Sequence, residues 1–220
     1  MYPLALIFRG GYAKWGGRVM RQFDPKPVTL EGSHVRLEPL LRHHAEDLFE
    51  VGKEETIWPY MSRPPLKSVE DARAWIGQAL EVAATDTQIP FAIIERASGK
   101  AIGSTRYMDI RRNDRGLEIG WTWIGTAFQR TAVNTECKYL LLRHAFEELG
   151  AVRVQLKTDL RNVRSQRAIE RLGAAREGVL RKHMVLWDGF IRDTVYYSVI
   201  EDEWPEVKRR LEDLLGRARA

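Results

Sequence analysis

The chain has 220 residues, 35 of them Lys or Arg and 30 Asp or Glu, with a formal net charge of +5 and a pI near 9.4. This length suits one domain, and the basic residues are scattered among acidic ones, which disfavours a nucleic-acid-binding protein. Cys137 is the only cysteine, and no apolar run approaches the roughly 20 residues that span a bilayer. A disulfide within the chain, a cysteine-based zinc site and a membrane span are therefore excluded. We expect a cytoplasmic protein that needs no metal.

The first nineteen residues differ from the rest of the chain. Residues 4–8 are apolar but too few for the core of a signal peptide, and residues 9–18 are rich in glycine and arginine without periodicity. We therefore expect residues 1–19 to be an extension outside the fold. Residues 20–220 are expected to form a single domain.

The domain is expected to begin with a strand. In VTLEGSHVRLEPL, apolar Val35 and Leu37 alternate with polar residues. The segment AEDLFEVG that follows predicts a short helix. The adjacent His43 and His44 point to different faces, so we expect both to be solvated rather than to bind a metal.

A loop with large apolar residues comes next. Residues 57–65, IWPYMSRPP, contain three prolines, which do not continue a helix. Trp58 and Tyr60 in this loop either fill the core or cover a binding site, and the pattern favours neither. A variant of the capping box then precedes an amphipathic helix, which we expect over residues 69–83.

Strands dominate the middle of the chain. The segment IPFAIIERASGKAIGSTRYMDIRRNDRGLEIGW predicts three antiparallel strands, joined by a Ser-Gly turn and an Asn-Asp-Arg-Gly turn. We expect the third strand to be half-buried, because apolar and small or polar residues alternate along it. The alternating residues are Leu117, Glu118, Ile119, Gly120, Trp121, Thr122 and Trp123.

This third strand leads through a loop into a helix. Leu142, Phe146 and Leu149 recur at three- and four-residue spacing, and Gly150 supplies the stop. The loop QRTAVNT, residues 129–135, therefore meets a helix N-terminus. Its unpaired N–H groups and positive dipole end suit an anion such as a pyrophosphate. Every helix has such an end, so this feature alone does not identify a ligand.

The last third of the chain is also expected to contain both strands and helices. Residues 152–157 alternate as a strand that follows a helix and can lie parallel to the strand before it. Asn162 is the expected N-cap of the next helix, and Gly173 its end. The Asp-Gly pair at 188–189 predicts a type I′ hairpin. A charged amphipathic helix is expected from Trp204.

The order of residues in the loop resembles that of the GNAT superfamily of acyl-CoA-dependent N-acyltransferases, which carry Q/R-x-x-G-x-G/A after their fourth strand. Gln129, Ala132 and Asn134 occupy its fixed positions. Ala132 stands where glycine is usual, and Asn134 replaces the second glycine or alanine. The spelling TAVNTE is similar to that of the ribosomal-protein and small-amine N-acetyltransferases, where an Asn-Thr pair commonly opens this helix. The resemblance extends from about Val28 to Trp204.

This resemblance implies an α+β fold of about seven strands, mostly antiparallel, with flanking helices and a central parallel pair splayed around a CoA site. In this family the pantetheine arm fills the gap by bonding to the fourth strand. An Asn and a small residue on a later helix face the cofactor. The residues implied to bind acetyl-CoA are Trp123, Ile124, Gln129, Arg130, Thr131, Ala132, Val133, Asn134, Thr135, Asn162 and Ser165. The family also implies that the loop with Trp58 and Tyr60 lines the acceptor pocket.

Acetyl transfer to a primary amine, such as a protein N-terminus, an amino acid or a small amine, is the expected function. Such amines are mostly protonated at neutral pH, so a general base is needed. Glu118 is the candidate, with a structural ion pair to an arginine as the alternative. Ile169 stands where many family members carry a tyrosine proposed as the general acid. This departure keeps open a non-catalytic protein that binds or senses acyl-CoA. The resemblance also admits a homodimer, and no nucleic-acid or membrane partner is expected.

Overall fold

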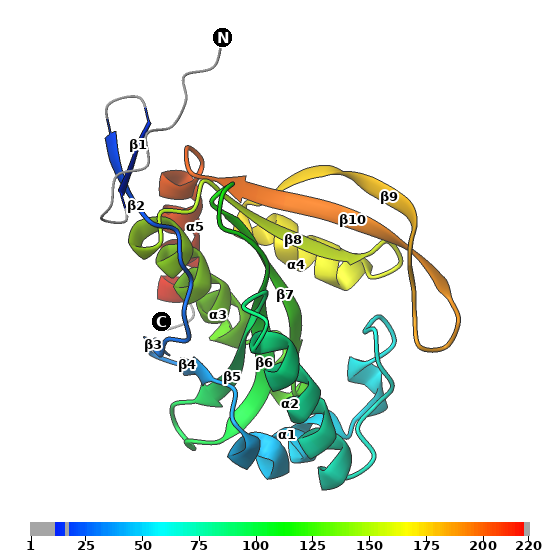
Figure 1. Cartoon of the computed structure of the whole chain (residues 1–220). Helices are drawn as coiled ribbons and strands as arrows, with labels where there is room; N and C mark the ends of the chain where they lie inside the picture. The colour runs from blue at the N-terminus through cyan, green and yellow to red at the C-terminus, as the bar shows by residue number, and fades with distance from the viewer. Residues whose placement is uncertain (1–11, 16–17, 218–220) are drawn as a thin grey trace.

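The computed structural model describes residues 12–15 and 18–217, with side chains from residue 22 onward. Figure 1 shows a curved sheet with helices on both faces. The strands are β1 (Tyr12–Trp15), β2 (Arg18–Arg21), β3 (Leu30–Glu31), β4 (Val35–Pro39), β5 (Ile89–Glu95), β6 (Ala101–Arg111), β7 (Gly116–Ile124), β8 (Arg153–Asp159), β9 (Ala175–Val185) and β10 (Ile191–Ile200). The helices are α1 (Ala45–Gly52), α2 (Val69–Ala83), α3 (Ala132–Arg143), α4 (Val163–Leu172) and α5 (Trp204–Arg217), with shorter segments η1 (Arg42–His44), η2 (Glu55–Ile57), η3 (Thr126–Phe128) and η4 (His144–Glu148).

The main sheet has eight strands in the described part of the chain, in the order β3-β4-β5-β6-β7-β8-β10-β9. Every neighbouring pair is antiparallel except β7 and β8, which are parallel. The α+β fold with a central parallel pair is thus confirmed. The sheet has eight strands rather than about seven because the first predicted strand divides. The N–H of Gly32 donates to the carbonyl of Val35 at 2.9 Å and turns the chain between β3 and β4.

The N-terminal segment contains a separate hairpin. Among the described residues, β1 and β2 pair only with each other, in a two-stranded sheet apart from the main one. The hairpin extends past residue 19, since β2 ends at Arg21. Residues 1–11 and 16–17 lie outside the described residues. A domain boundary at residue 20 therefore stays a prediction.

The main sheet is covered on both faces by hydrophobic cores. One core lies between the sheet and α3, α4 and α5, and the other lies beneath α1 and α2. Along β5, Phe91 and Ile93 enter the first core while Ala92 and Ile94 enter the second. Successive side chains of a strand point to opposite faces. The sheet is therefore buried on both sides in its central strands.

Strands β7 and β8 run side by side for a short distance only. The paired residues are Gly116 with Arg153, Leu117 with Val154, and Glu118 with Gln155. Beyond these pairs β7 follows β6 and β8 follows β10, so the two strands diverge. The β6–β7 register also shifts near Trp121, which has a φ of 50°. Such a bulge bends a strand, and a positive φ costs a non-glycine residue on the order of 1 kcal/mol.

Glu136 joins α3 to the beginning of the sheet. Its carboxylate accepts the backbone N–H groups of Ser33 at 2.8 Å, His34 at 2.6 Å and Val35 at 2.8 Å. A Cβ atom on Gly32 would lie 2.6 Å from this carboxylate, so the close approach requires glycine. Hydrogen bonds to an ionised acceptor are stronger than neutral ones. These three bonds therefore hold α3 against β4.

Removing this carboxylate should destabilise the fold. Glu136→Ala leaves three N–H groups without their acceptor, and we expect it to lower the unfolding free energy by about 3 kcal/mol. Glu81→Ala, on the exposed face of α2, is the control and should change the unfolding free energy by less than about 0.5 kcal/mol. Urea unfolding followed by circular dichroism measures both. Equal midpoints for the two variants would show that Glu136 does not hold α3.

The hairpin of β9 and β10 is confirmed, but its predicted type I′ turn is wrong. The N–H of Leu186 donates to the carbonyl of Phe190 at 2.9 Å, and the N–H of Gly189 donates to the carbonyl of Leu186 at 3.0 Å. A type I′ turn needs two residues with positive φ. Only Gly189 has one here, at 83°. The strands are therefore joined by a longer loop in which Gly189 alone is left-handed.

Candidate functional site

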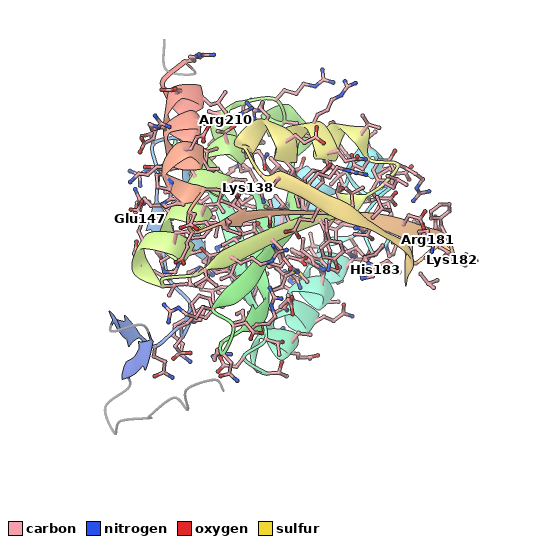
Figure 2. The ribbon with its side chains drawn as sticks, turned by 90° about the horizontal axis from the view of Figure 1, so that it is seen from above. Lys138, Glu147, Arg181, Lys182, His183 and Arg210 are labelled. Atoms are coloured by element: carbon pink, nitrogen blue, oxygen red, sulfur yellow. The ribbon has the colours of Figure 1, made fainter. Side chains whose placement is uncertain are left out.

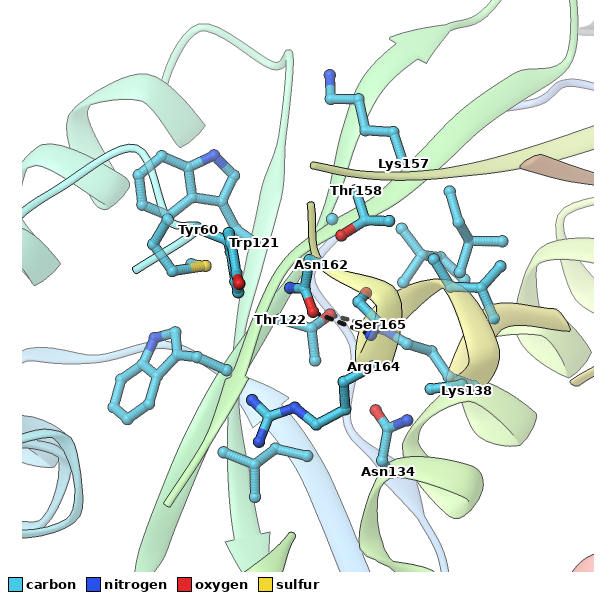
Figure 3. A pocket seen from close by; sticks show the side chains of 18 of the residues that line it. Tyr60, Trp121, Thr122, Asn134, Lys138, Lys157, Thr158, Asn162, Arg164 and Ser165 are labelled. Carbon is cyan, nitrogen blue, oxygen red and sulfur yellow. Dashed lines mark hydrogen bonds between the residues drawn. The ribbon is translucent and has the colours of Figure 1, made fainter. Parts of the chain in front are cut away.

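A cavity of about 580 Å³ opens where β7 and β8 diverge. Its walls come from the loop after η2, from β7 and β8, from the first turns of α3 and α4, and from the β9–β10 hairpin. Figure 3 shows Tyr60 and Trp121 on one side of the cavity and Asn134, Lys138 and Ser165 on the other. The cavity is therefore lined by elements from both faces of the sheet.

Most residues predicted to bind the cofactor line this cavity. They are Trp123, Ile124, Gln129, Arg130, Thr131, Asn134, Asn162 and Ser165. The side chains of Ala132, Val133 and Thr135 do not line it. Val133 lies in the core, and Thr135 accepts a hydrogen bond from Arg171 at 2.8 Å. Successive residues of a helix are turned by about 100°, so only one side of the segment faces the cavity.

The loop before α3 presents the N-terminus of this helix to the cavity. Arg130 has a φ of 63°, and Thr131 is the N-cap, whose Oγ1 accepts the N–H of Val133 at 3.3 Å. Gln129 donates to the last carbonyl of β7 at 3.0 Å and accepts from Arg164 at 2.8 Å. The other first-turn N–H groups have no acceptor within the helix. Together with the exposed guanidinium groups of Arg130 and Arg164, these N–H groups suit a diphosphate.

The first turn of α4 forms the opposite wall of the gap. Asn162 is the N-cap, as predicted, and its Oδ1 accepts the N–H of Ser165 at 3.0 Å (Figure 3). Ser165 and Ala168 are small, which leaves room between α4 and β7 for an elongated ligand. Ile169 also lines the cavity and is buried, and it offers no proton donor.

Glu118 lies at the point where β7 and β8 part, and it lines the cavity. Its side chain is 1% exposed, and its Oε2 accepts from Gln155 at 3.0 Å and lies 3.1 Å from Nζ of Lys157. Its Oε1 lies beside Gly120, where a Cβ atom would approach to 2.8 Å. One oxygen is therefore held by β8, while the other lies beside Gly120, whose Cβ position is also approached by Sδ of Met108 to 2.6 Å. The ionic partner of Glu118 is a lysine, not an arginine.

The two aromatic residues expected on the substrate side occupy different places. Tyr60 lines the cavity, with the guanidinium of Arg161 5.5 Å from its ring centre. Trp58 is 1% exposed and donates from its indole N–H to the carbonyl of Gly52 at 2.8 Å. Its ring lies 5.1 Å from that of Trp123. Trp58 therefore belongs to the core and does not line the cavity, because its one polar group is satisfied inside.

Lys138 faces the cavity from α3 and was not identified from the sequence. It is 5% exposed, and its Nζ donates to Oγ1 of Thr122 at 2.6 Å. Burial lowers the pKa of Lys138 to about 8. One signal could have identified it: Lys138 follows Asn134 by four residues and so shares its face of the helix.

The lowered pKa of Lys138 should make stability depend on pH. Lysine in the unfolded chain titrates near 10.4, so between about pH 8 and that value the unfolded state binds more protons and stability rises with pH. Below pH 8 the buried charge costs about 3 kcal/mol. We expect Lys138→Met to raise the unfolding free energy at pH 7, with the gain shrinking toward pH 10.

Denaturant unfolding at both pH values tests this expectation, with the exposed Lys100→Met as the control. The control should show no such dependence on pH. A Lys138→Met variant that is less stable than the parent at both pH values would show that the bond to Thr122 outweighs the cost of burial.

Among the described residues, one group of side chains has the spacing of metal ligands. The candidate ligand atoms of Glu38, His43 and His44 lie within 4.8 Å of one another. Nδ1 of His44 accepts the N–H of Leu41 at 3.0 Å, and its Nε2 lies 3.0 Å from Oε1 of Glu38. Both ring nitrogens are therefore engaged at the start of α1. The expectation that His44 is solvated is wrong, since it is 4% exposed.

No helix in the described ranges has the length and apolar character to cross a membrane.

The splayed parallel strands and the helix N-terminus beside their gap are the arrangement that the resemblance to the GNAT superfamily implies. The pattern of the acetyltransferase (GNAT) domain matches residues 34–175. The chain belongs to this family.

Three similar proteins illustrate the relationship. YdaF of Bacillus subtilis (strain 168), provisionally named a ribosomal N-acetyltransferase, is 32% identical over 106 residues, which are 48% of this chain and 57% of YdaF. That match spans just over half the length of this relative. A crystal structure from T. thermophilus, provisionally described as an acetyltransferase, has a TM-score of 0.79 and 43% identity, covering 87% of this chain and 98% of that one. The fold is also that of Mycobacterium smegmatis RimJ, solved with CoA-disulfide, with a TM-score of 0.75 at 18% identity over 86% of this chain and 95% of RimJ.

Proposed function

We propose that this protein transfers an acetyl group from acetyl-CoA to a primary amine. The observation that carries the proposal is one cavity that joins the α3 N-terminus, the unpaired edge of β7 and the carboxylate of Glu118. The reaction needs little more than a bound thioester and a neutral amine within attack distance. We further propose that it acts in the cytoplasm.

The residues present fit acetyl-CoA, which when bound supplies an activated acyl group. Its diphosphate suits the first-turn N–H groups of α3, with Arg130 and Arg164 beside them. Its extended arm suits the gap between β7 and the small residues of α4. In that gap the β8 side of residues 119–124 has no strand partner, so a ligand with amide groups would satisfy backbone groups that are otherwise unpaired.

Glu118 is proposed to be the general base. An acceptor ammonium must lose a proton before attack, and a carboxylate in the same cavity takes it directly or through a water. Lys157 and Gln155 hold one oxygen and so fix the orientation of the carboxylate. The other oxygen lies beside Gly120, and Glu118 lines the cavity in which an acceptor amine would bind.

The acceptor is proposed to be a protein N-terminus, an amino acid or a small amine. The name of YdaF points to a ribosomal protein, but the identity of 32% covers only 48% of this chain. A protein that binds acyl-CoA without turnover is the second candidate, and Ile169, in place of a proton donor, favours it. A screen of acetyl-CoA against amino acids, polyamines, aminoglycosides and N-terminal peptides, measured by thiol release, separates the two. Release with any one class supports an enzyme.

The N–H of Ala132 should contribute to CoA binding. Thr131 is extended, with a φ of −104° and a ψ of −174°, and so lies outside the α region that a following proline disfavours; proline is also tolerated at the first position of a helix. Ala132→Pro should therefore leave α3 intact and weaken CoA binding roughly 10-fold to 100-fold, the effect of losing a hydrogen bond to a charged group. Thr131→Ala removes the cap instead, and it should cost about 1 kcal/mol of stability while changing CoA affinity little. Calorimetry with CoA and thermal unfolding compare the two variants, and equal CoA affinities would contradict the backbone cradle.

Glu118→Gln keeps the shape of the side chain and removes its basicity. General-base assistance is worth about 100-fold to 10,000-fold, so we expect turnover at neutral pH to fall within that range while CoA affinity stays unchanged. Part of the loss should return at high pH, where the free amine is abundant. Glu55→Gln, exposed in η2, is the control and should retain full turnover. Turnover of Glu118→Gln equal to that of the parent at every pH would make Glu118 a structural residue.

A further inference from the structure

The end of the cavity near β10 contains a buried cation without an anionic partner. Arg192 is 6% exposed and lines the cavity. Its Nε donates to Oγ1 of Thr194 at 3.0 Å, and Thr194 lies opposite Asp159 in the register of β8 and β10. Within the described part of the chain, no carboxylate oxygen lies within 4.0 Å of the Arg192 guanidinium.

The neighbouring carboxylates are already paired with other cations. Glu118 pairs with Lys157 at 3.1 Å. Asp159, 1% exposed, holds Arg161 through bonds of 3.0 Å to Nε and 2.7 Å to Nη2. Asp159 and Glu118 also attract Arg192 electrostatically, but of the three cations near these two carboxylates it is the one that neither contacts within 4.0 Å.

The other groups around Arg192 carry no charge. Nδ1 of His183 lies 3.0 Å from Oγ1 of Thr194. Burial and the positive charges of Lys157 and Arg192 lower the pKa of His183, so its ring is neutral at pH 7. Uncharged residues also line the cavity, among them Tyr60, Ser62, Met108, Trp121 and Met184. A cation in such surroundings is poorly hydrated and interacts strongly with an anion.

We propose that Arg192 binds a carboxylate of the acceptor, so that the preferred acceptors are primary amines that also carry a carboxylate. An unpaired buried guanidinium is costly, and its fork of N–H groups matches a carboxylate through two parallel bonds. Glu118 and Arg192 both line the cavity and interact electrostatically. One small acceptor can therefore present its amine to the first and its carboxylate to the second. The inference rests on the proposed function, because it concerns the acceptor of the same site.

The same charges disfavour two other classes of acceptor. A polyamine or an aminoglycoside carries further ammonium groups, which would meet the buried Arg192 without a free carboxylate beside it. Like charges brought together in a low-dielectric site repel strongly. These polycations are therefore expected to be poor acceptors. The phosphates of CoA are the other anions at hand, but their expected site is the α3 N-terminus.

The kinetic test compares acceptors that differ only in one charge. Free amino acids are paired with their carboxamides, and short peptides with an acidic second residue are paired with the corresponding amide peptides. We expect the parent protein to prefer the carboxylate member of at least one set roughly 10-fold to 100-fold in kcat/KM, mainly through KM. The set that shows the preference identifies the source of the carboxylate. Arg192→Gln should lose this preference by slowing the carboxylate acceptor alone, and Arg192→Lys should keep part of it.

Arg181→Gln is the matched control, because it makes the same change of charge at an exposed position of the same hairpin (Figure 2). It should retain the full preference. CoA affinity should be the same in all these variants. A roughly 10-fold or larger loss of CoA affinity in Arg192→Gln alone would assign Arg192 to the cofactor and overturn the proposal.

A binding measurement separates this inference from the proposed enzyme activity. Calorimetry of the CoA-loaded protein compares N-acetyl amino acids and N-acetyl acidic peptides with their carboxamides. Tighter binding of a carboxylate, lost in Arg192→Gln, supports the anion site even when no amine is acetylated. If the protein acetylates amines but prefers the carboxylate compound in neither the kinetic nor the binding measurement, the inference is overturned and the proposed acetyltransferase activity stands. If the protein neither acetylates an amine nor binds a carboxylate, the proposed function and this inference are both overturned.

Discussion

The structure depends on where β7 and β8 stop pairing. Parallel pairing ends at Glu118 and Gln155, and from there each strand follows a different neighbour. Backbone N–H and C=O groups inside a protein need hydrogen-bond partners. A ligand between the two diverging strands could supply such partners along their inner edges. The cavity, the α3 N-terminus and Glu118 all lie around this gap. The fold thus produces a binding site by leaving part of a sheet unpaired.

Costly features gather around the same gap. Trp121 and Arg130 have positive φ, and Lys138 and Arg192 are buried cations. Each lowers the stability of the protein by itself, and such features persist where the surrounding structure holds them in place. That support comes from the two cores and from Glu136, whose three backbone hydrogen bonds hold α3 against β4. Within α3, Glu136 therefore stabilises the fold, whereas Lys138 faces the cavity.

The cavity has two electrostatically different ends. Near the first turns of α3 and α4, the cations are exposed guanidinium groups, which suit a mobile, highly charged diphosphate. Near β10, Arg192 is buried, while the neighbouring Lys157 and Arg161 are paired with Glu118 and Asp159. Membership of the GNAT family accounts for the first end and for the fold. The second end is where we propose that an acceptor is selected, through the buried Arg192.

The sequence by itself determined the elements and much of the lining of the cavity. Period-two alternation identified β7, the loop and helix after it followed from their spacing, and Asn162 was recognisable as a cap, because all these signals are local. Only the tertiary structure decided that Trp58 lies in the core while Tyr60 lines the cavity. The same holds for Lys138 and Arg192. Periodicity shows which face of an element is buried, but not which distant element packs against it. Whether a basic side chain forms an ion pair depends on residues far away in the sequence. Near Arg192, the carboxylates of Glu118 and Asp159 form their ion pairs with Lys157 and Arg161.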